Sequence, residues 1–152
     1  MTLYERITSD MISALKNKDK DSLSTIRLLK SAIDLGKINN QTRREEVKDE
    51  EVIEVVSRQI KTHKESIEQF KTAGRDDLVS KLEKEIELLS TYLPEQLTPL
   101  EIESEVNKIF EEIKPNGKQD LGKVMKEALG RLKGKADFKL VSELIQSKLS
   151  QL

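Results

Sequence analysis

The sequence predicts an all-α protein, with an N-terminal domain of four helices over residues 1–93 and a small C-terminal three-helix bundle over residues 98–152. Hydrophobic and charged residues each make up 36% of the 152 residues, which is typical of helices with a narrow apolar stripe and a solvated outer side. Aromatic residues make up only 3%, and no segment alternates apolar and polar residues as strands do. Apolar residues instead recur every three or four positions, which indicates helices.

The first predicted helix begins after Thr2, whose hydroxyl is a suitable N-cap. Its apolar residues are Leu3, Ile7, Met11, Ala14 and Leu15. A polar break follows at residues 17–21, where Asp19 or Asp21 can cap a second helix that ends around Gly36 and Asn39-Asn40. The predicted buried side of this second helix consists of Leu23, Ile26, Leu29, Ala32 and Ile33.

Residues 41–48 have no apolar period and predict a polar connection, in which Arg43-Arg44 is interpreted as part of an ordinary loop rather than as a phosphate contact. A long third helix follows and ends at Ala73-Gly74, a common glycine terminus. Its stripe consists of Val52, Val56, Ile60, His63, Ile67 and Phe70. Asp76 or Asp77 is expected to cap the fourth helix, and Pro94 to end it. The stripe of this helix consists of Leu78, Leu82, Ile86, Leu89 and Leu93.

Residues 94–97 are the predicted linker between the two domains, because a new helix start follows at once. Thr98 and Glu101 fit a capping box, with Pro99 at the first helical position. The stripe of this fifth helix consists of Ile102, Val106, Ile109, Phe110 and Ile113. Residues 114–117 form a turn. The sixth helix carries Leu121, Val124, Met125, Ala128, Leu129 and Leu132, and the seventh, capped by Asp137, carries Leu140, Val141, Leu144, Ile145 and Leu149.

The net charge of −1 conceals an asymmetry along the chain. Residues 1–113 contain 18 Lys/Arg and 24 Asp/Glu, whereas residues 114–152 contain 9 and 4. This split suggests an acidic N-terminal module and a basic C-terminal one. The absence of cysteine excludes disulfides and thiolate chemistry. No apolar run approaches the roughly 20 residues that cross a bilayer, and no signal peptide is evident, so we expect a cytoplasmic protein without a membrane partner.

Four segments carry a resemblance to known sequences: Arg-Leu-Leu-Lys-Ser-Ala-Ile at 27–33, Tyr-Leu-Pro-Glu-Gln-Leu at 92–97, Gly-Lys-Val-Met-Lys at 122–126 and Gly-Lys-Ala-Asp at 134–137. Together they are similar to the GatB/YqeY family over essentially the whole chain, above all to its small stand-alone bacterial members. The chain departs from the family pattern at Phe138, where that pattern has glycine. We interpret Phe138 as packing into the three-helix core in preference to stacking on a nucleobase.

The resemblance implies homology to the helical and tail domains of GatB, a subunit of the tRNA-dependent amidotransferase. That enzyme converts Glu-tRNA(Gln) or Asp-tRNA(Asn) to the amidated form with glutamine and ATP. Its tail domain holds the outer corner of the tRNA, whereas the chemistry belongs to a larger catalytic domain that this sequence does not resemble. The resemblance thus implies a non-catalytic protein that binds tRNA or another structured RNA, with the amidation machinery as a possible partner that it assists.

The predicted RNA contacts are basic residues interleaved with glycine in the last third of the chain. They are Lys118, Gly122, Lys123, Lys126, Arg131, Lys133, Gly134, Lys135 and Lys139. Lysines on one side can neutralise phosphates, and glycine lets another backbone approach closely. Charge alone favours an ordinary solvated lysine surface over an RNA-binding one. When the glycines and the family resemblance are included, the two interpretations are equally favoured.

The other residues that could support catalysis or ligand binding have simpler structural explanations, so we expect no catalytic residue, metal or cofactor. Gly134-Lys135 is not a nucleotide loop, because alanine follows the lysine and no strand precedes it. His63 is the only histidine and is interpreted as a partly buried structural residue. A protein-binding module that uses Phe138 and Leu140 is the alternative. A carbon–nitrogen ligase with glutamine as amido-N-donor is disfavoured, because ATP and glutamine sites are unaccounted for.

Overall fold

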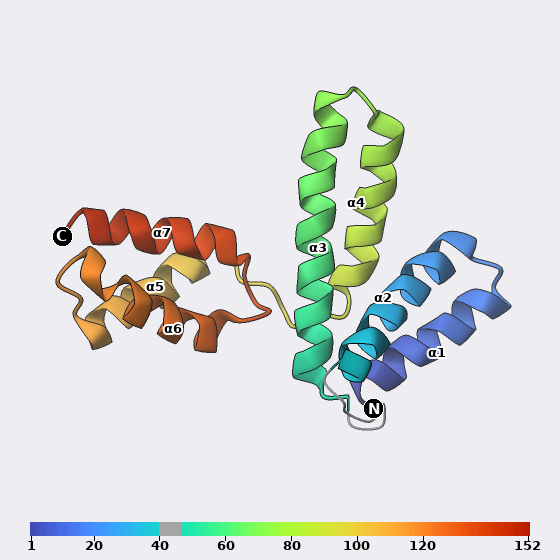
Figure 1. The fold of residues 1–152 in the computed structure, drawn as a ribbon, viewed down its shortest axis with the longest axis horizontal. Helices are drawn as coiled ribbons and strands as arrows, with labels where there is room; N and C mark the ends of the chain where they lie inside the picture. The colour runs from blue at the N-terminus through green and yellow to red at the C-terminus, as the bar shows by residue number, and fades with distance from the viewer. Residues whose placement is uncertain (40–46) are drawn as a thin grey trace. The chain divides into compact units, whose positions relative to one another are not determined.

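The part of the chain that the structure describes is all-helical, which confirms the predicted all-α class. The computed structural model describes residues 1–39 and 47–152, and in these ranges the chain forms seven α-helices, one short 3-10 helix and no strand (Figure 1). Contacts between residues divide the chain into two compact units, Met1–Leu93 and Pro94–Leu152. Each unit buries its own apolar cluster.

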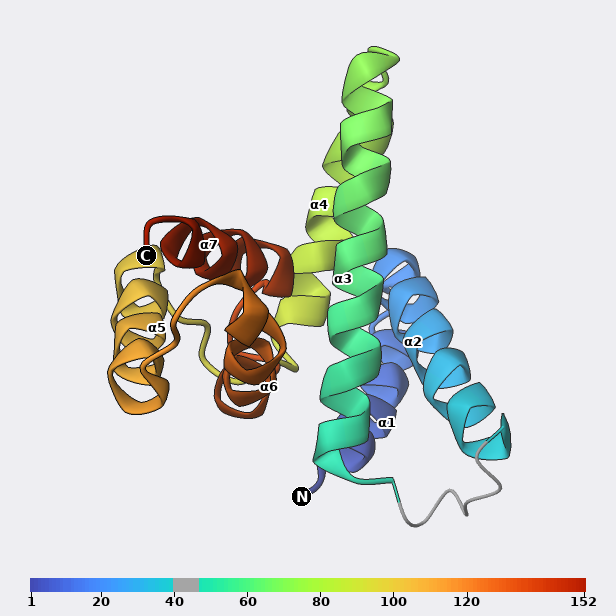
Figure 2. The same cartoon turned by 60° about the vertical axis from the view of Figure 1, so that its left-hand side comes forward.

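The first unit consists of two helical hairpins. They contain α1 (Leu3–Lys16), α2 (Lys20–Asn39), α3 (Asp49–Thr72) and α4 (Asp76–Ser90). Figures 1 and 2 show α3 and α4 as a long antiparallel pair, with α1 and α2 against the N-terminal part of α3. The predicted cap of α1 is confirmed, since Thr2 Oγ1 accepts a hydrogen bond from the Glu5 amide at 3.2 Å. Of the two candidate caps of α2, Asp19 accepts a hydrogen bond at Oδ1 from the Ser22 amide at 3.2 Å.

The two ends of α3 are set by local hydrogen bonds. At its start the Lys48 amide donates to Glu51 Oε2 at 3.4 Å. At its end Gly74 adopts φ +71°, and the Arg75 amide donates to the Phe70 carbonyl at 2.9 Å. This pattern, in which glycine takes the left-handed conformation after the last helical residue, is the predicted terminus.

Two predictions for α4 are wrong. Its N-cap is Arg75, and Asp76 and Asp77 lie in the first turn. The Asp77 carboxylate does not cap the helix and instead accepts hydrogen bonds at both oxygens from the Arg75 guanidinium, each at 3.2 Å. The helix also ends at Ser90, before Pro94 is reached. Amides of residues 91–93 bond to carbonyls three residues back, which closes the helix as a tighter turn.

The core of the first unit joins all four helices around α3. Its buried members are Ile7, Ala14, Leu23, Ile26, Leu29, Ile33, Val47, Val52, Val56, Ile60, Leu89 and Tyr92. Leu15 is exposed, although it belongs to the predicted stripe of α1. Arg43 and Arg44 of the predicted polar connection lie outside the described residues. Val47, near the end of the segment predicted as a polar connection (residues 41–48), is buried and belongs to the core.

The second unit is a small bundle of α5 (Pro99–Ile113), η2 (Lys118–Asp120), α6 (Leu121–Leu132) and α7 (Phe138–Ser150). Of the capping box predicted at Thr98 and Glu101, the Thr98 half is present, since Thr98 Oγ1 accepts from the Glu101 amide at 3.2 Å. The predicted cap Asp137 is confirmed, with Oδ1 accepting from the Lys139 amide at 3.0 Å. Its buried cluster is Ile102, Val106, Ile109, Val124, Ala128, Leu132, Val141, Ile145 and Leu149. Residues 94–97, predicted as a linker, belong to this unit.

Candidate nucleic-acid interface

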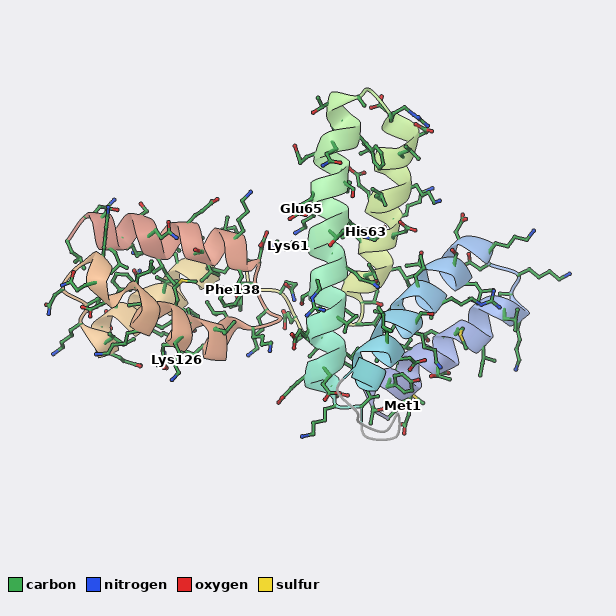
Figure 3. The ribbon with its side chains drawn as sticks, viewed as in Figure 1. Met1, Lys61, His63, Glu65, Lys126 and Phe138 are labelled. Carbon is green, nitrogen blue, oxygen red and sulfur yellow. The ribbon has the colours of Figure 1, made fainter. Side chains whose placement is uncertain are left out.

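The outer side of α6 carries two lysines between two glycines. Val124, Ala128 and Leu132, spaced four apart, point into the bundle and are buried. The helical period then turns residues 122, 123, 126 and 130 away from the core. All four are exposed, and Lys126 extends from α6 into solvent (Figure 3). Two of the predicted cations therefore share one side of a helix with the predicted contact Gly122 and with Gly130, which is outside the predicted set.

Neither glycine on this side is required by the packing of α6. A Cβ atom built on Gly122 or Gly130 would meet nothing within 4 Å. Glycine inside a helix is less stable than alanine by roughly 0.5–1 kcal/mol, so the fold gains nothing from either residue. What the glycines provide is bare helix backbone beside Lys123 and Lys126, open to another molecule.

Lys133 and Lys135 lie in the turn that follows α6, which we call the basic turn (residues 133–135). Both lysines are exposed, whereas Gly134 between them is buried. Gly134 has φ +79°, a conformation that favours glycine over other residues. Gly134 therefore shapes the turn, and its predicted contact with RNA remains a prediction.

The basic turn is held by residues of the segment that precedes α5. Gln96 Nε2 donates to the Gly134 carbonyl at 2.6 Å and to the Pro94 carbonyl at 2.8 Å. The Leu97 amide donates to the Lys135 carbonyl at 2.9 Å. Sequence reasoning missed these contacts, because Gln96 and Gly134 are 38 residues apart and share no periodic pattern.

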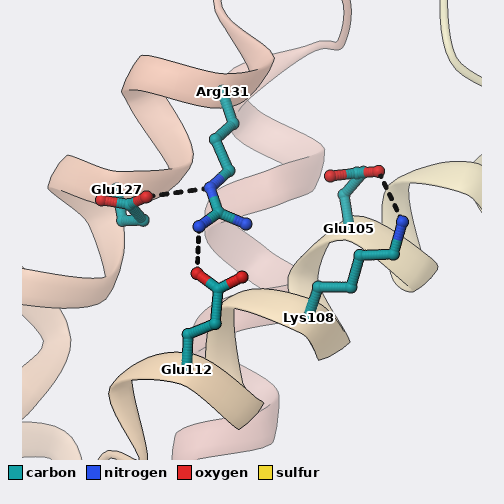
Figure 4. A network of polar contacts seen from close by, with 5 residues as sticks. All are labelled: Glu105, Lys108, Glu112, Glu127 and Arg131. Carbon is teal, nitrogen blue, oxygen red and sulfur yellow. Dashed lines mark hydrogen bonds and ion pairs between the residues drawn. The ribbon is translucent and has the colours of Figure 1, made fainter.

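Arg131, another predicted contact, is engaged in a local ion network. Its guanidinium Nε donates to Glu127 Oε1 at 2.8 Å, and Nη2 pairs with Glu112 of α5 (Figure 4). The hydrogen bond to Glu112, followed by that to Glu127, raises the pKa of Arg131 above its usual value. The side chain therefore joins α5 to α6, and an RNA phosphate would compete with two carboxylates for it.

The last two predicted cations lie outside α6. Lys118 is in η2, at the start of α6, and Lys139 is in the first turn of α7. Both are exposed. A 12-residue helix such as α6 is about 18 Å long, so Lys118 and the basic turn lie near its opposite ends. The predicted residues extend along the whole helix and do not form one compact cluster.

The charge asymmetry lies inside the second unit and not between the units. Residues 1–93 contain 17 Lys/Arg and 18 Asp/Glu, a net charge of −1, and residues 94–152 contain 10 of each. Within the second unit, α5 has five glutamates and one lysine, whereas residues 114–152 have a net charge of +5. The interpretation of an acidic N-terminal module is therefore wrong, because its count had included α5.

His63 is a partly buried structural residue, as predicted. Its Nδ1 lies 2.9 Å from the Gln59 carbonyl, and its Nε2 lies 3.1 Å from Glu85 Oε2 on α4. Figure 3 shows the ring directed from α3 toward α4. Thr25 of α2 donates to the other Glu85 oxygen at 3.4 Å. The four residues join three helices of the first unit by polar contacts.

Other candidate sites add little to this picture. Over residues 1–39 and 47–152, His, Asp and Glu side chains form no group of three that could hold a metal ion. A hollow of about 460 Å³ lies between the N-terminal part of α2 and α4. In the part of the chain that the structure describes, no helix is both long and apolar enough to cross a bilayer.

Phe138 packs against the apolar cluster of the second unit, which confirms the preferred interpretation of this residue. Leu140, its neighbour in α7, is 45% exposed, and Leu129 of α6 is 47% exposed. Both leucines had been assigned to predicted core stripes. They form part of the solvent-facing surface of the second unit instead.

Comparisons with known proteins give matches along nearly the whole chain. A family model described as "Yqey-like protein" matches residues 4–149. The protein "Altered inheritance of mitochondria protein 41, mitochondrial" of Pyrenophora tritici-repentis is 33% identical over 146 residues, which cover 93% of this chain and 77% of that protein. An uncharacterised protein of Schizosaccharomyces pombe is 34% identical over 89 residues, which cover 59% of this chain and 70% of that protein.

Proposed function

Since the chain belongs to the family of YqeY-like proteins, we propose that it binds tRNA or a related structured RNA through the outer side of α6 and the basic turn. The observation that carries this proposal is the exposed arrangement of Gly122, Lys123, Lys126 and Gly130 on one side of a helix. The lysines contribute charge for phosphates, and the glycines leave the helix backbone accessible to a ribose-phosphate strand.

Counterion release gives the expected strength of such an interface. Each phosphate that a lysine neutralises changes the slope of log affinity against log salt concentration by about −0.9. Each such contact therefore makes binding about eightfold tighter at 0.1 M salt than at 1 M salt. Lys123, Lys126, Lys133 and Lys135 could together supply four such contacts. The glutamates of α5 oppose this attraction, so RNA must approach from the side of α6 and α7 rather than from α5.

The protein has no catalytic role of its own under this proposal. Its one histidine is occupied by Gln59 and Glu85, and Arg131 is occupied by two glutamates. The amidation machinery implied by the family resemblance would then be a partner that supplies the chemistry. The expected cytoplasmic location likewise remains a prediction.

Single charge reversals test the interface. Filter binding of bulk tRNA at 0.1 M salt should show at least tenfold weaker binding for Lys126→Glu and for Lys123→Glu. Lys108→Glu is the matched control, because Lys108 is exposed on α5 of the same unit and the net charge changes equally. Equal losses for all three variants, or no binding by the unaltered chain at micromolar concentration and low salt, would contradict the proposal.

A protein-binding surface is the second candidate, and the exposure of Leu129 and Leu140 favours it. Phe138 contributes little to this surface because its ring packs against the core. In that case Leu140→Ser would abolish capture of a protein partner, and Lys126→Glu would leave capture unchanged. The opposite result favours RNA.

We also propose that the two units fold as separate domains. Each unit has its own buried cluster, and the second, at 59 residues, is within the size range of independently folding domains. A fragment of residues 94–152 should therefore unfold cooperatively on heating. A fragment that is unfolded at 25 °C by circular dichroism would refute the proposal.

A further inference from the structure

We infer that Gln96 is a positioning residue for RNA binding, which holds the basic turn in its binding conformation without itself contacting RNA. This inference rests on the proposed function. It concerns a residue outside the predicted set of contacts, on the segment that precedes α5.

The side chain of Gln96 spans two backbone carbonyls. A glutamine amide has two N–H donors, and both are used here, one for Pro94 and one for Gly134. The contact at Gly134 is short, at 2.6 Å, and its acceptor belongs to a buried residue. The hydrogen bond itself is partly buried, so loss of the donor would leave the Gly134 carbonyl without its side-chain partner unless the turn shifts toward water.

The neighbouring residue fixes the segment in place. The Leu97 amide donates to the Lys135 carbonyl at 2.9 Å, and the Leu97 side chain packs against the buried cluster of the second unit. The turn is also closed on itself, since the Lys135 amide donates to the Leu132 carbonyl at 2.9 Å. Residues 96 and 97 thus bond to the carbonyls of two consecutive turn residues.

These contacts limit the positions of the two lysines. Lys133 and Lys135 lie two residues apart, so their Cα atoms are separated by at most about 7 Å. Between them Gly134 has φ +79°, a conformation that glycine leaves easily unless neighbouring groups hold it. Gln96 supplies such a group. A turn that is already ordered loses less conformational entropy when phosphate binds.

The test compares Gln96→Met with Gln146→Met in tRNA binding. Methionine keeps the length of the side chain and removes the donors. Gln146 donates only to Ser142 of its own helix, at 3.2 Å, which makes the second variant a matched control. Gln96→Met should weaken binding by about three- to tenfold, the equivalent of one neutral hydrogen bond. Gln146→Met should have no effect.

A double-mutant cycle separates positioning from general stability. In a Lys133→Met, Lys135→Met background the additional effect of Gln96→Met should disappear, because the turn no longer contacts RNA. Amide exchange at Leu97 and Lys135 should accelerate in Gln96→Met alone. Unchanged affinity in Gln96→Met, or an equal loss in both backgrounds, would overturn the inference while the proposed function stands. Failure of the unaltered chain to bind tRNA would overturn both.

Discussion

Replacement of Tyr92 by phenylalanine tests how much the hydrogen bond between Tyr92 and Asp10 stabilises the first unit. Tyr92 follows α4 and is only 1% exposed. Its hydroxyl donates to Asp10 Oδ2 of α1 at 2.6 Å, and the Arg6 guanidinium lies 5.0 Å from the ring centre. Tyr92→Phe removes the hydrogen bond and retains the buried ring.

The expected loss follows from these contacts. A hydrogen bond to a charged group contributes about 1.5–3 kcal/mol. Asp10 has 42% of its side chain exposed, so water partly replaces the lost donor, and we expect a loss of about 1–2 kcal/mol in the free energy of unfolding. For a unit of this size, each kcal/mol lowers the midpoint by about 4–8 °C. Differential scanning calorimetry measures this shift.

Tyr4→Phe is the matched comparison, because Tyr4 donates to Asp34 Oδ1 at 2.8 Å and Asp34 has only 16% of its side chain exposed. Less water can replace the lost donor there than at Asp10, so the loss in stability should be at least as large as that of Tyr92→Phe. Equal midpoints for Tyr92→Phe and the unaltered chain would refute the reasoning.

The same residue predicts a dependence on alkaline pH. Burial, and then the hydrogen bond to Asp10, raises the pKa of Tyr92 above its usual value, which is about 10. Above pH of about 10 the unfolded chain therefore loses this proton while the folded chain keeps it. The contribution to stability is complete below that pH and is lost as pH rises further. Stability should fall less steeply above pH of about 10 in Tyr92→Phe.

Two further predictions concern glycine conformation and core packing, both measured by denaturant unfolding. Gly74→Ala should lower stability by about 1–2 kcal/mol, because Gly74 has φ +71°. Gly36→Ala, inside α2 and with nothing within 4 Å of its added Cβ, should raise stability by about 0.5–1 kcal/mol; the same sign for both changes would contradict this reasoning. Ile109→Ala in the core of the second unit should cost about 2–5 kcal/mol, whereas Leu100→Ala, at a residue 78% exposed, should be nearly neutral.

The parts of the fold that could be predicted depend on neighbours a few residues away. The caps at Thr2, Asp19, Thr98 and Asp137 are satisfied within three residues of each cap. Asp76 and Asp77 lie in the first turn of α4 instead of capping it, and the carboxylate of Asp77 pairs with Arg75. The apolar period identified each α-helix of the described residues but not the short helix η2. It also overestimated burial at the edges of the stripes, where Leu15, Leu129 and Leu140 are exposed.

Part of the candidate site could likewise be predicted from the sequence, and part could not. The period of α6 determines that Lys123 and Lys126 are exposed beside Gly122 and Gly130, so sequence alone could indicate this arrangement. The pairing of Arg131 with Glu112 of α5 could not be foreseen, since many surface carboxylates were available. The support of the basic turn by Gln96 depends on a side chain meeting a distant carbonyl, which no periodic pattern records.

The salt dependence of tRNA binding tests the central claim most directly. The affinity of the unaltered chain and of a Lys123→Met, Lys126→Met variant is measured from 50 mM to 300 mM salt. If both lysines neutralise phosphates, the slope of log affinity against log salt should decrease by about 1.4–1.8 in magnitude in the variant. An unchanged slope would mean that the outer side of α6 does not contact the RNA backbone.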